Sequence, residues 1–144
     1  MAARHTHLIL GDRRMPHVFV EYSANVADHA PIDELVAAMH TAIIETDIGP
    51  LAGIRTRGFR RDDYAIADRH ADNMFVAVII RIGPGRTPEV KKACVADMTE
   101  ALKIHLAHLC DTKPIALSVE MQEIDAEFRI NHNNLRDYLE ARHG

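Results

Sequence analysis

The hydrophobic residues of this chain change their spacing along the sequence, and these changes predict its elements. Residues 17–22 are mostly β-branched and aromatic, which is typical of a strand. After Pro31 the apolar residues recur at helical spacing until the Gly-Pro pair at 49–50 ends the predicted helix. A second strand is predicted over residues 53–59, and the charged and polar residues 60–73 predict a loop. The first half therefore has the order strand, helix, strand.

The second half repeats this order. Residues 74–82 give the strongest strand pattern of the chain, and residues 115–122 predict a fourth strand. Between them Thr87 and Pro88 predict the start of a helix, since threonine caps helices and proline suits the first turn. This helix carries an apolar stripe of Val95, Met98, Leu102, Leu106 and Leu109. We therefore predict an α/β fold in which two β-α-β units form a four-stranded mixed sheet backed by two helices.

The predicted strand 74–82 is apolar on both of its alternating sets of positions. One set is Phe75, Ala77 and Ile79, and the other is Val76, Val78 and Ile80. Two helices cover only one face of a four-stranded sheet, so an apolar second face indicates packing against another subunit. The pattern alone therefore predicts an oligomer.

Composition and charge narrow the class of protein. A chain of 144 residues has the length of one domain, and its 47% hydrophobic and 26% charged residues are typical of a globular fold. No apolar run approaches the ~20 residues that span a bilayer. The first residues lack the apolar stretch of a secretory signal, so we expect no membrane contact and a cytoplasmic location. A formal net charge of −4 argues against a nucleic-acid partner, so an anionic ligand requires a local group of arginines.

The cysteines and the paired histidines predict no redox or metal chemistry. Cys94 and Cys110 are sixteen positions apart in one predicted helix, about 24 Å at the usual rise, which is beyond disulfide reach. We expect both to be small buried apolar residues. His105 and His108 are helical neighbours without an evident third ligand, so no metal site is predicted.

Five segments in order carry a resemblance to one family. On its own, Pro16 would simply open a strand. However, Pro16-His-Val-Phe-Val-Glu-Tyr-Ser-Ala-Asn-Val26 is similar to the amino terminus of the 5-carboxymethyl-2-hydroxymuconate isomerases, which belong to the tautomerase superfamily. The other segments, in the order and at the spacing of that family, are Pro-Leu-Ala-Gly-Ile-Arg-Thr-Arg at 50–57, Ile-Gly-Pro-Gly-Arg at 82–86, Ala-Leu-Ser-Val-Glu at 116–120 and Asn-His-Asn-Asn-Leu at 131–135. The resemblance implies a tautomerase-like domain over residues 16–144 and a homotrimer whose sheets face inward.

The resemblance makes Pro16 the candidate catalytic residue. A proline at a chain terminus has a basic amine, whereas the nitrogen of an internal proline is an amide. In the resembled family this terminal amine acts as general base and then acid, with its basicity lowered by apolar surroundings and nearby cations. The implied reaction is cofactor-free 1,3-keto-enol tautomerisation of 5-carboxymethyl-2-hydroxymuconate or a similar carboxylated 2-hydroxydienoate.

The same resemblance points to Arg55 and Arg86 as ligands of the substrate carboxylates. A guanidinium offers a planar fork and keeps its charge at working pH. Arg86 precedes a predicted helix amino terminus and suits a fixed carboxylate, whereas Arg55 suits the reacting end. By position alone, Arg86 equally fits an exposed turn, and Arg55 fits a solvated strand face that it shares with Arg57. The roles of Arg57, Arg60 and Arg61 stay open.

Residues 1–15 leave three interpretations open, because Pro16 has a free amine only if they are absent. In the first, translation begins at Met15. In the second, a leader is removed by processing. In the third, an extension is retained, with residues 5–10 as an extra β segment. Two alternatives to the main function follow. One is a tautomerase that acts on another 2-oxo acid, and the other is a non-catalytic trimer whose extension blocks the proline.

Overall fold

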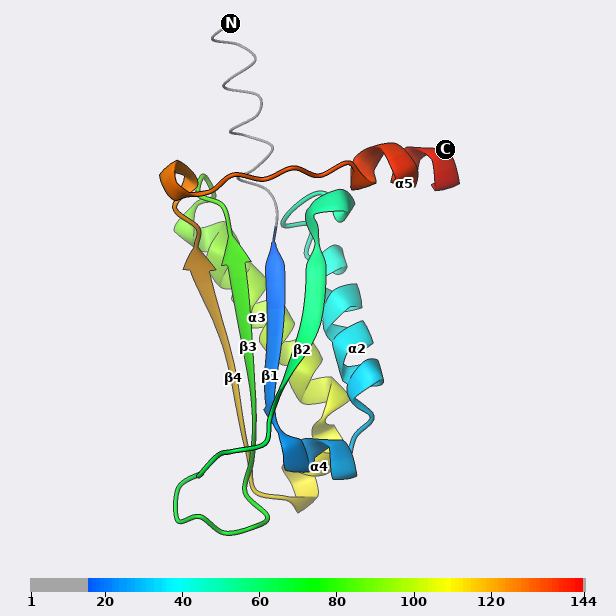
Figure 1. The fold of residues 1–144 in the computed structure, drawn as a ribbon. Coiled ribbons are helices and arrows are strands. Elements are labelled where there is room, and N and C mark those ends of the chain that lie inside the picture. The colour runs from blue at the N-terminus through cyan, green and yellow to red at the C-terminus, as the bar shows by residue number, and fades with distance from the viewer. Residues whose placement is uncertain (1–15, 144) are drawn as a thin grey trace, which may run out of the picture.

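The computed structural model describes residues 16–143 of the chain, so the hypotheses on residues 1–15 and the predicted β segment 5–10 lie outside the described part. Its four strands form one sheet in the order β2-β1-β3-β4. The strands are β1 (His17–Ser23), β2 (Arg55–Arg61), β3 (Met74–Ile82) and β4 (Ile115–Glu123). β1 pairs with β2 and β3 with β4 in parallel, and β1 pairs with β3 antiparallel. The predicted mixed sheet of two β-α-β units is confirmed (Figure 1).

Two helices lie against one face of this sheet, α2 (Ile32–Glu45) and α3 (Pro88–His105) (Figure 1). They form the core with the residues of β1 and β3 that point toward them. Its fully buried members include Val18, Val20, Leu35, Met39, Val76, Val78, Ile80, Met98 and Leu102. The apolar stripe of the predicted second helix is confirmed at Met98 and Leu102.

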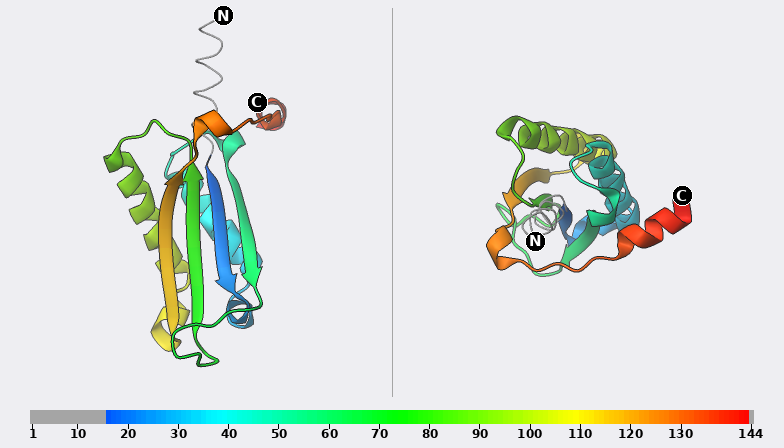
Figure 2. Two further views of the ribbon diagram at one scale, coloured as in Figure 1. Left: turned by 60° about the vertical axis from the view of Figure 1, so that its left-hand side comes forward. Right: turned by 90° about the horizontal axis from the view of Figure 1, so that it is seen from above.

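Within residues 16–143, no helix lies over the opposite face of the sheet (Figures 1 and 2). Along β1 and β3, fully buried residues alternate with half-buried ones such as Phe19 and Ile79. We call the face that carries these half-buried residues the open face.

The main differences from the sequence-based predictions lie at β2 and in the second long helix, whereas β1 and β4 each end one residue later than predicted. β2 begins at Arg55, two positions later than predicted, because Leu51–Gly53 forms the 3-10 turn η2. The long second helix also breaks at Leu106, where φ is −102° and ψ is 19°, and resumes as α4 (Ala107–Thr112).

The prediction that Cys110 is buried is wrong. In α4 the side chain of Leu109 turns into the core and is 2% exposed. Its sequence neighbour Cys110 therefore points outward and is exposed, whereas Cys94 is buried as predicted.

The pattern did not predict the path of the chain after β4. It forms the short 3-10 turn η3 (Ala126–Phe128), runs in an extended form across the end of the sheet on its open side, and ends in α5 (Leu135–His143) (Figure 2). The Asn133 side chain fixes this segment by donating a hydrogen bond to the Ala52 carbonyl, 2.8 Å away. None of the helices of residues 16–143 combines the length and the apolar character that crossing a bilayer requires.

Candidate active site

Pro16 lies where the chain enters the sheet, and it is buried. The parallel register places His17 opposite Arg55. As a result, the Arg55 backbone N–H donates to the Pro16 carbonyl at 3.2 Å. The structure therefore brings two of the three predicted site residues together at one end of the sheet.

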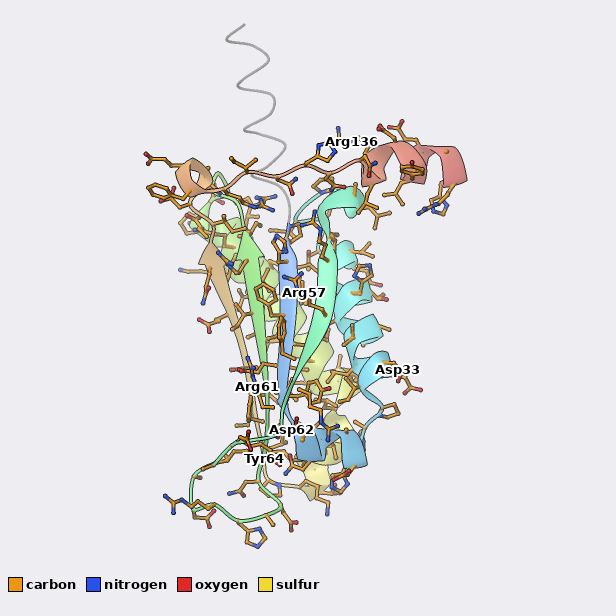
Figure 3. The ribbon with its side chains drawn as sticks, viewed as in Figure 1. Asp33, Arg57, Arg61, Asp62, Tyr64 and Arg136 are labelled. Carbon is orange, nitrogen blue, oxygen red and sulfur yellow. The ribbon has the colours of Figure 1, made fainter. Side chains whose placement is uncertain are left out.

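His17, the next residue, points to the open face and lies between two guanidinium groups. Arg57 Nη1 is 3.3 Å from His17 Nδ1, and Arg129 Nη2 is 3.1 Å from Nε2. The Arg57 guanidinium also lies over the Phe19 ring, 4.3 Å from its centroid. Figure 3 shows Arg57 in front of the open face. Residues from two strands and from the segment after β4 thus meet around one imidazole.

This part of the open face is strongly positive. Burial lowers the pKa of His17 to about 4, and the charges of Arg129, Arg55, Arg57 and Arg81 act in the same direction. Within residues 16–143, no carboxylate forms a salt bridge with Arg55, Arg57 or Arg81. We call His17, Arg55, Arg57, Arg81 and Arg129 the cationic cluster.

Arg86, the third predicted site residue, is engaged by the backbone. Its Nε donates to the Ile48 carbonyl at 2.9 Å and its Nη1 to the Gly83 carbonyl at 3.2 Å. Gly85, at φ 117°, takes a conformation that side-chain-bearing residues rarely adopt and lets the chain turn before α3. Arg86 therefore joins the loop after α2 to the turn after β3.

This turn belongs to the same end of the molecule as Pro16, because the antiparallel register places Arg81, near the end of β3, opposite His17 at the start of β1. The proposed contact of Arg86 with a carboxylate stays a prediction.

Arg60 and Arg61, two of the three arginines whose roles the sequence left open, form ion pairs away from this end. Arg60 Nε is 2.9 Å from Asp62, and Arg61 Nε is 2.7 Å from Glu21. Figure 3 shows Arg61 and Asp62 toward the opposite end of the sheet from the start of β1. Their pairing explains these two charges without a ligand.

Sequence reasoning missed three members of the cluster. His17 and Arg81 each had a usable signal, since both share the alternation of their strands with neighbours on the open face. Arg129 had none, because it belongs to a segment without a hydrophobic period. Among the described residues, no group of three or more His, Cys, Asp or Glu side chains is arranged to hold a metal ion.

Comparison with known proteins gives a consistent result. The family model for 5-carboxymethyl-2-hydroxymuconate isomerase matches residues 16–139. The 5-carboxymethyl-2-hydroxymuconate Delta-isomerase of Escherichia coli is 34% identical over 121 residues, which cover 84% of this chain and 96% of that protein.

Solved structures also resemble this chain. The crystal structure of a 5-carboxymethyl-2-hydroxymuconate isomerase from Deinococcus radiodurans R1 superposes with a TM-score of 0.82 at 31% identity, covering 90% of this chain and 98% of that one. The F6 fused 4-OT wild-type asymmetric trimer shares the fold, with a TM-score of 0.55 at 17% identity over 83% of this chain and 98% of that one.

Proposed function

Because this chain belongs to the 5-carboxymethyl-2-hydroxymuconate isomerase family and is therefore an isomerase, we propose that it catalyses the cofactor-free tautomerisation of a carboxylated 2-hydroxydienoate. The proposed acid and base is the amine of Pro16, freed as the first residue of the active protein. The proposed substrate is 5-carboxymethyl-2-hydroxymuconate or a close analogue.

One observation carries this proposal: the family match begins at Pro16, the residue at which the chain enters the sheet beside the cationic cluster. A buried secondary amine near several guanidinium groups is disfavoured in its protonated form, since burial and like charges both act against an added proton. Such an amine is available as a base near neutral pH.

The reaction balances without an oxidant or a cofactor. The Pro16 amine takes the proton of the 2-hydroxyl group, and the O–H electrons form the C=O bond. The π electrons of the adjacent C=C bond move to carbon, which receives the same proton from the Pro16 ammonium. Arg55, beside Pro16, stabilises the negative charge that spreads into the dienolate. Arg86 holds a carboxylate remote from the reacting end.

We also propose that the active form is a homotrimer whose open faces point inward. The half-buried apolar residues of the open face support this arrangement, because a partner sheet would remove them from water. Apolar faces of this kind are normally covered in a stable protein.

The experiment compares the full 144-residue chain with a protein that begins at Pro16, using 2-hydroxymuconate-type enols as substrates. We expect the shorter protein to ketonise them about a hundred-fold faster or more, within the range of general acid–base catalysis. A third protein, with Pro16→Ala at the terminus, keeps a free amine but replaces the secondary amine by a primary one. Equal rates for the full chain and the Pro16 form would exclude this amine as the base.

A further inference from the structure

We propose that residues 124–143, which follow β4 and which we call the arm, form a docking surface for a second copy of this chain. One side of the arm contacts its own protomer, and the other side contacts a neighbouring protomer. This role rests on the homotrimer proposed above. It adds to the packing of the open faces a second interface that the arm supplies.

The arm carries a group of exposed apolar side chains. Phe128 is 81% exposed, and Ile130, two positions later, is fully exposed. Leu135 and Tyr138 of α5 are exposed as well. These are four of the nine large apolar side chains that residues 16–143 expose, and they lie within eleven consecutive residues. Single exposed apolar residues are ordinary, whereas a group of them marks an interaction site.

Arg129 shows which side of the arm faces away from its own protomer. Its Nη2 is 3.1 Å from His17 Nε2, so this side chain turns toward the sheet. The backbone of Arg129 is extended, at φ −135° and ψ 131°, and successive side chains of an extended chain point in opposite directions. Ile130 therefore points away from the sheet, and Phe128 on the other side of Arg129 is likewise exposed.

Hydrogen bonds on its inner side hold the arm in place. The Asn133 side chain donates to the Ala52 carbonyl at 2.8 Å. At the start of the arm, the Asp125 side chain accepts a hydrogen bond from the Glu127 backbone N–H at 3.0 Å. A surface that is already ordered loses less conformational entropy on binding. A partner therefore meets apolar side chains that are already in position.

The helix α5 needs a partner more than the rest of the arm does. It has nine residues, none of them is buried, and it lies against the short turn η2 of its own chain. A helix this short is marginal in water, and most helices are stabilised by burying one apolar side. Figure 1 and the view from above in Figure 2 show α5 projecting from the body of the protomer. A surface outside the protomer is therefore the one that can cover Leu135 and Tyr138.

Two features favour a second copy over another partner. The arm crosses the end of the sheet on its open side (Figure 2), so its outer side continues the surface that the proposed homotrimer buries. In addition, α5 has two positive residues, Arg136 and Arg142, against Asp137 and Glu140, so its formal charge is zero with His143 neutral. Balanced charge suits a protein surface, whereas a helix that binds membranes normally has an excess of Lys and Arg.

The first test is photo-cross-linking of the purified full chain with benzoylphenylalanine in place of Phe128. On illumination the benzophenone group reacts with C–H groups that it touches. We expect covalent dimers and trimers on a denaturing gel, because position 128 contacts a neighbouring copy. The same replacement at Ile104, an exposed apolar residue of α3, is the matched control. It should leave the chains unlinked to one another.

The second test measures how much the arm contributes to assembly. Ile130→Glu places a charge where a neighbouring copy would bury it, which opposes association. The protein concentration at which half of the assembly dissociates should rise about ten-fold or more, as for loss of one buried apolar side chain. Sedimentation velocity over a dilution series measures this concentration. Ile104→Glu is the control and should leave it unchanged, and both variants should keep the wild-type circular dichroism spectrum.

The docking role of the arm is overturned if the group at position 128 reacts only within its own chain, or if Ile130→Glu dissociates at the same concentration as Ile104→Glu. A trimeric wild type with either result would retain the homotrimer and reject the arm as part of its interface. A monomeric wild type would reject both. Because these experiments use the full chain and measure no turnover, their outcome is independent of whether Pro16 is the base.

Discussion

At the scale of single residues, His17 links the site to the stability of the fold. Its pKa is lowered from 6.5 to about 4 in the folded chain, by burial first and then by four guanidinium groups. In the unfolded chain the imidazole titrates near its ordinary value, so between these two pH values the unfolded state binds more protons. The free energy of unfolding therefore rises with pH across this window, and it falls as the solution is acidified from about pH 6.5 toward 4.

We predict that His17→Asn removes this contribution, because the side chain no longer titrates. Urea unfolding at several pH values should show a smaller loss of stability on acidification than in the wild type. The control is His132→Asn, which removes an exposed imidazole from the segment after β4 and should leave the pH dependence unchanged. If the stability of the His17→Asn variant depends on pH as the wild type does, the inference that the His17 imidazole is neutral in the folded chain is wrong.

Arg86 and Arg55 allow a matched pair of substitutions. Arg86 donates to the Ile48 and Gly83 carbonyls, so Arg86→Ala should lower the free energy of unfolding by about 1–3 kcal/mol and should also raise KM. Arg55→Ala should chiefly lower kcat, about ten- to a hundred-fold, because its charge acts on the transition state. Chemical unfolding and steady-state kinetics of the Pro16 form measure both effects. Unchanged kinetics in both variants would reject the two arginines as ligands.

The sequence predicted some residues of the candidate site and missed others, and the physical reason differs from one residue to the next. Strand alternation indicated that Arg57 shares a face with Arg55, and the register confirms it. Alternation within a strand says nothing about which segment crosses that face. Arg129 contacts His17 from 112 positions away, and no local pattern specifies a contact of that length.

At the scale of elements, the difference between a local period and a long-range contact explains which parts of the fold the sequence predicted. β1, β3 and both main helices follow periods of two or 3.6 residues, so the sequence predicted their types and order. The segment after β4 has no period, and η3 and α5 have no buried residues. Long-range contacts such as Asn133 with Ala52 hold it in place, and no local period specifies them.

The start of α3 offers a direct test of a local signal. The Thr87 side chain accepts a hydrogen bond from the Val90 backbone N–H at 3.3 Å, as the predicted cap requires. Thr87→Ala should therefore lower the free energy of unfolding by about 1 kcal/mol. Thr87→Ser keeps the hydroxyl and should stay within a few tenths of a kcal/mol of the wild type, as measured by chemical denaturation. Equal losses in the two variants would show that the cap hydrogen bond contributes nothing.

At the scale of the whole molecule, the open face determines how the proposed homotrimer assembles. We expect sedimentation velocity to show a trimer at micromolar concentration. Ile79→Glu places a carboxylate in the middle of the open face, between Phe19 and Glu120 in the sheet register, and should produce smaller species. Burying this charge without a partner opposes association.

The matched control for this substitution lies on the other side of the molecule. Ile104 is on α3 and is 69% exposed, so Ile104→Glu adds the same charge without touching the sheet. It should sediment as the wild type does. A monomeric wild type, or equal effects of the two substitutions, would reject the inward-facing sheets.

The loop between the two β-α-β units has a practical consequence for work on this protein. Residues 62–73 are mostly exposed and lie at the opposite end of the sheet from Pro16 (Figure 1). An enzyme that needs a free terminal proline tolerates no affinity tag or fluorescent label fused in front of that residue. The loop offers an internal attachment point instead, because an insertion there interrupts neither the β1–β3 pairing nor the helices. Immobilised or labelled protein made in this way would keep its amino terminus available for chemistry.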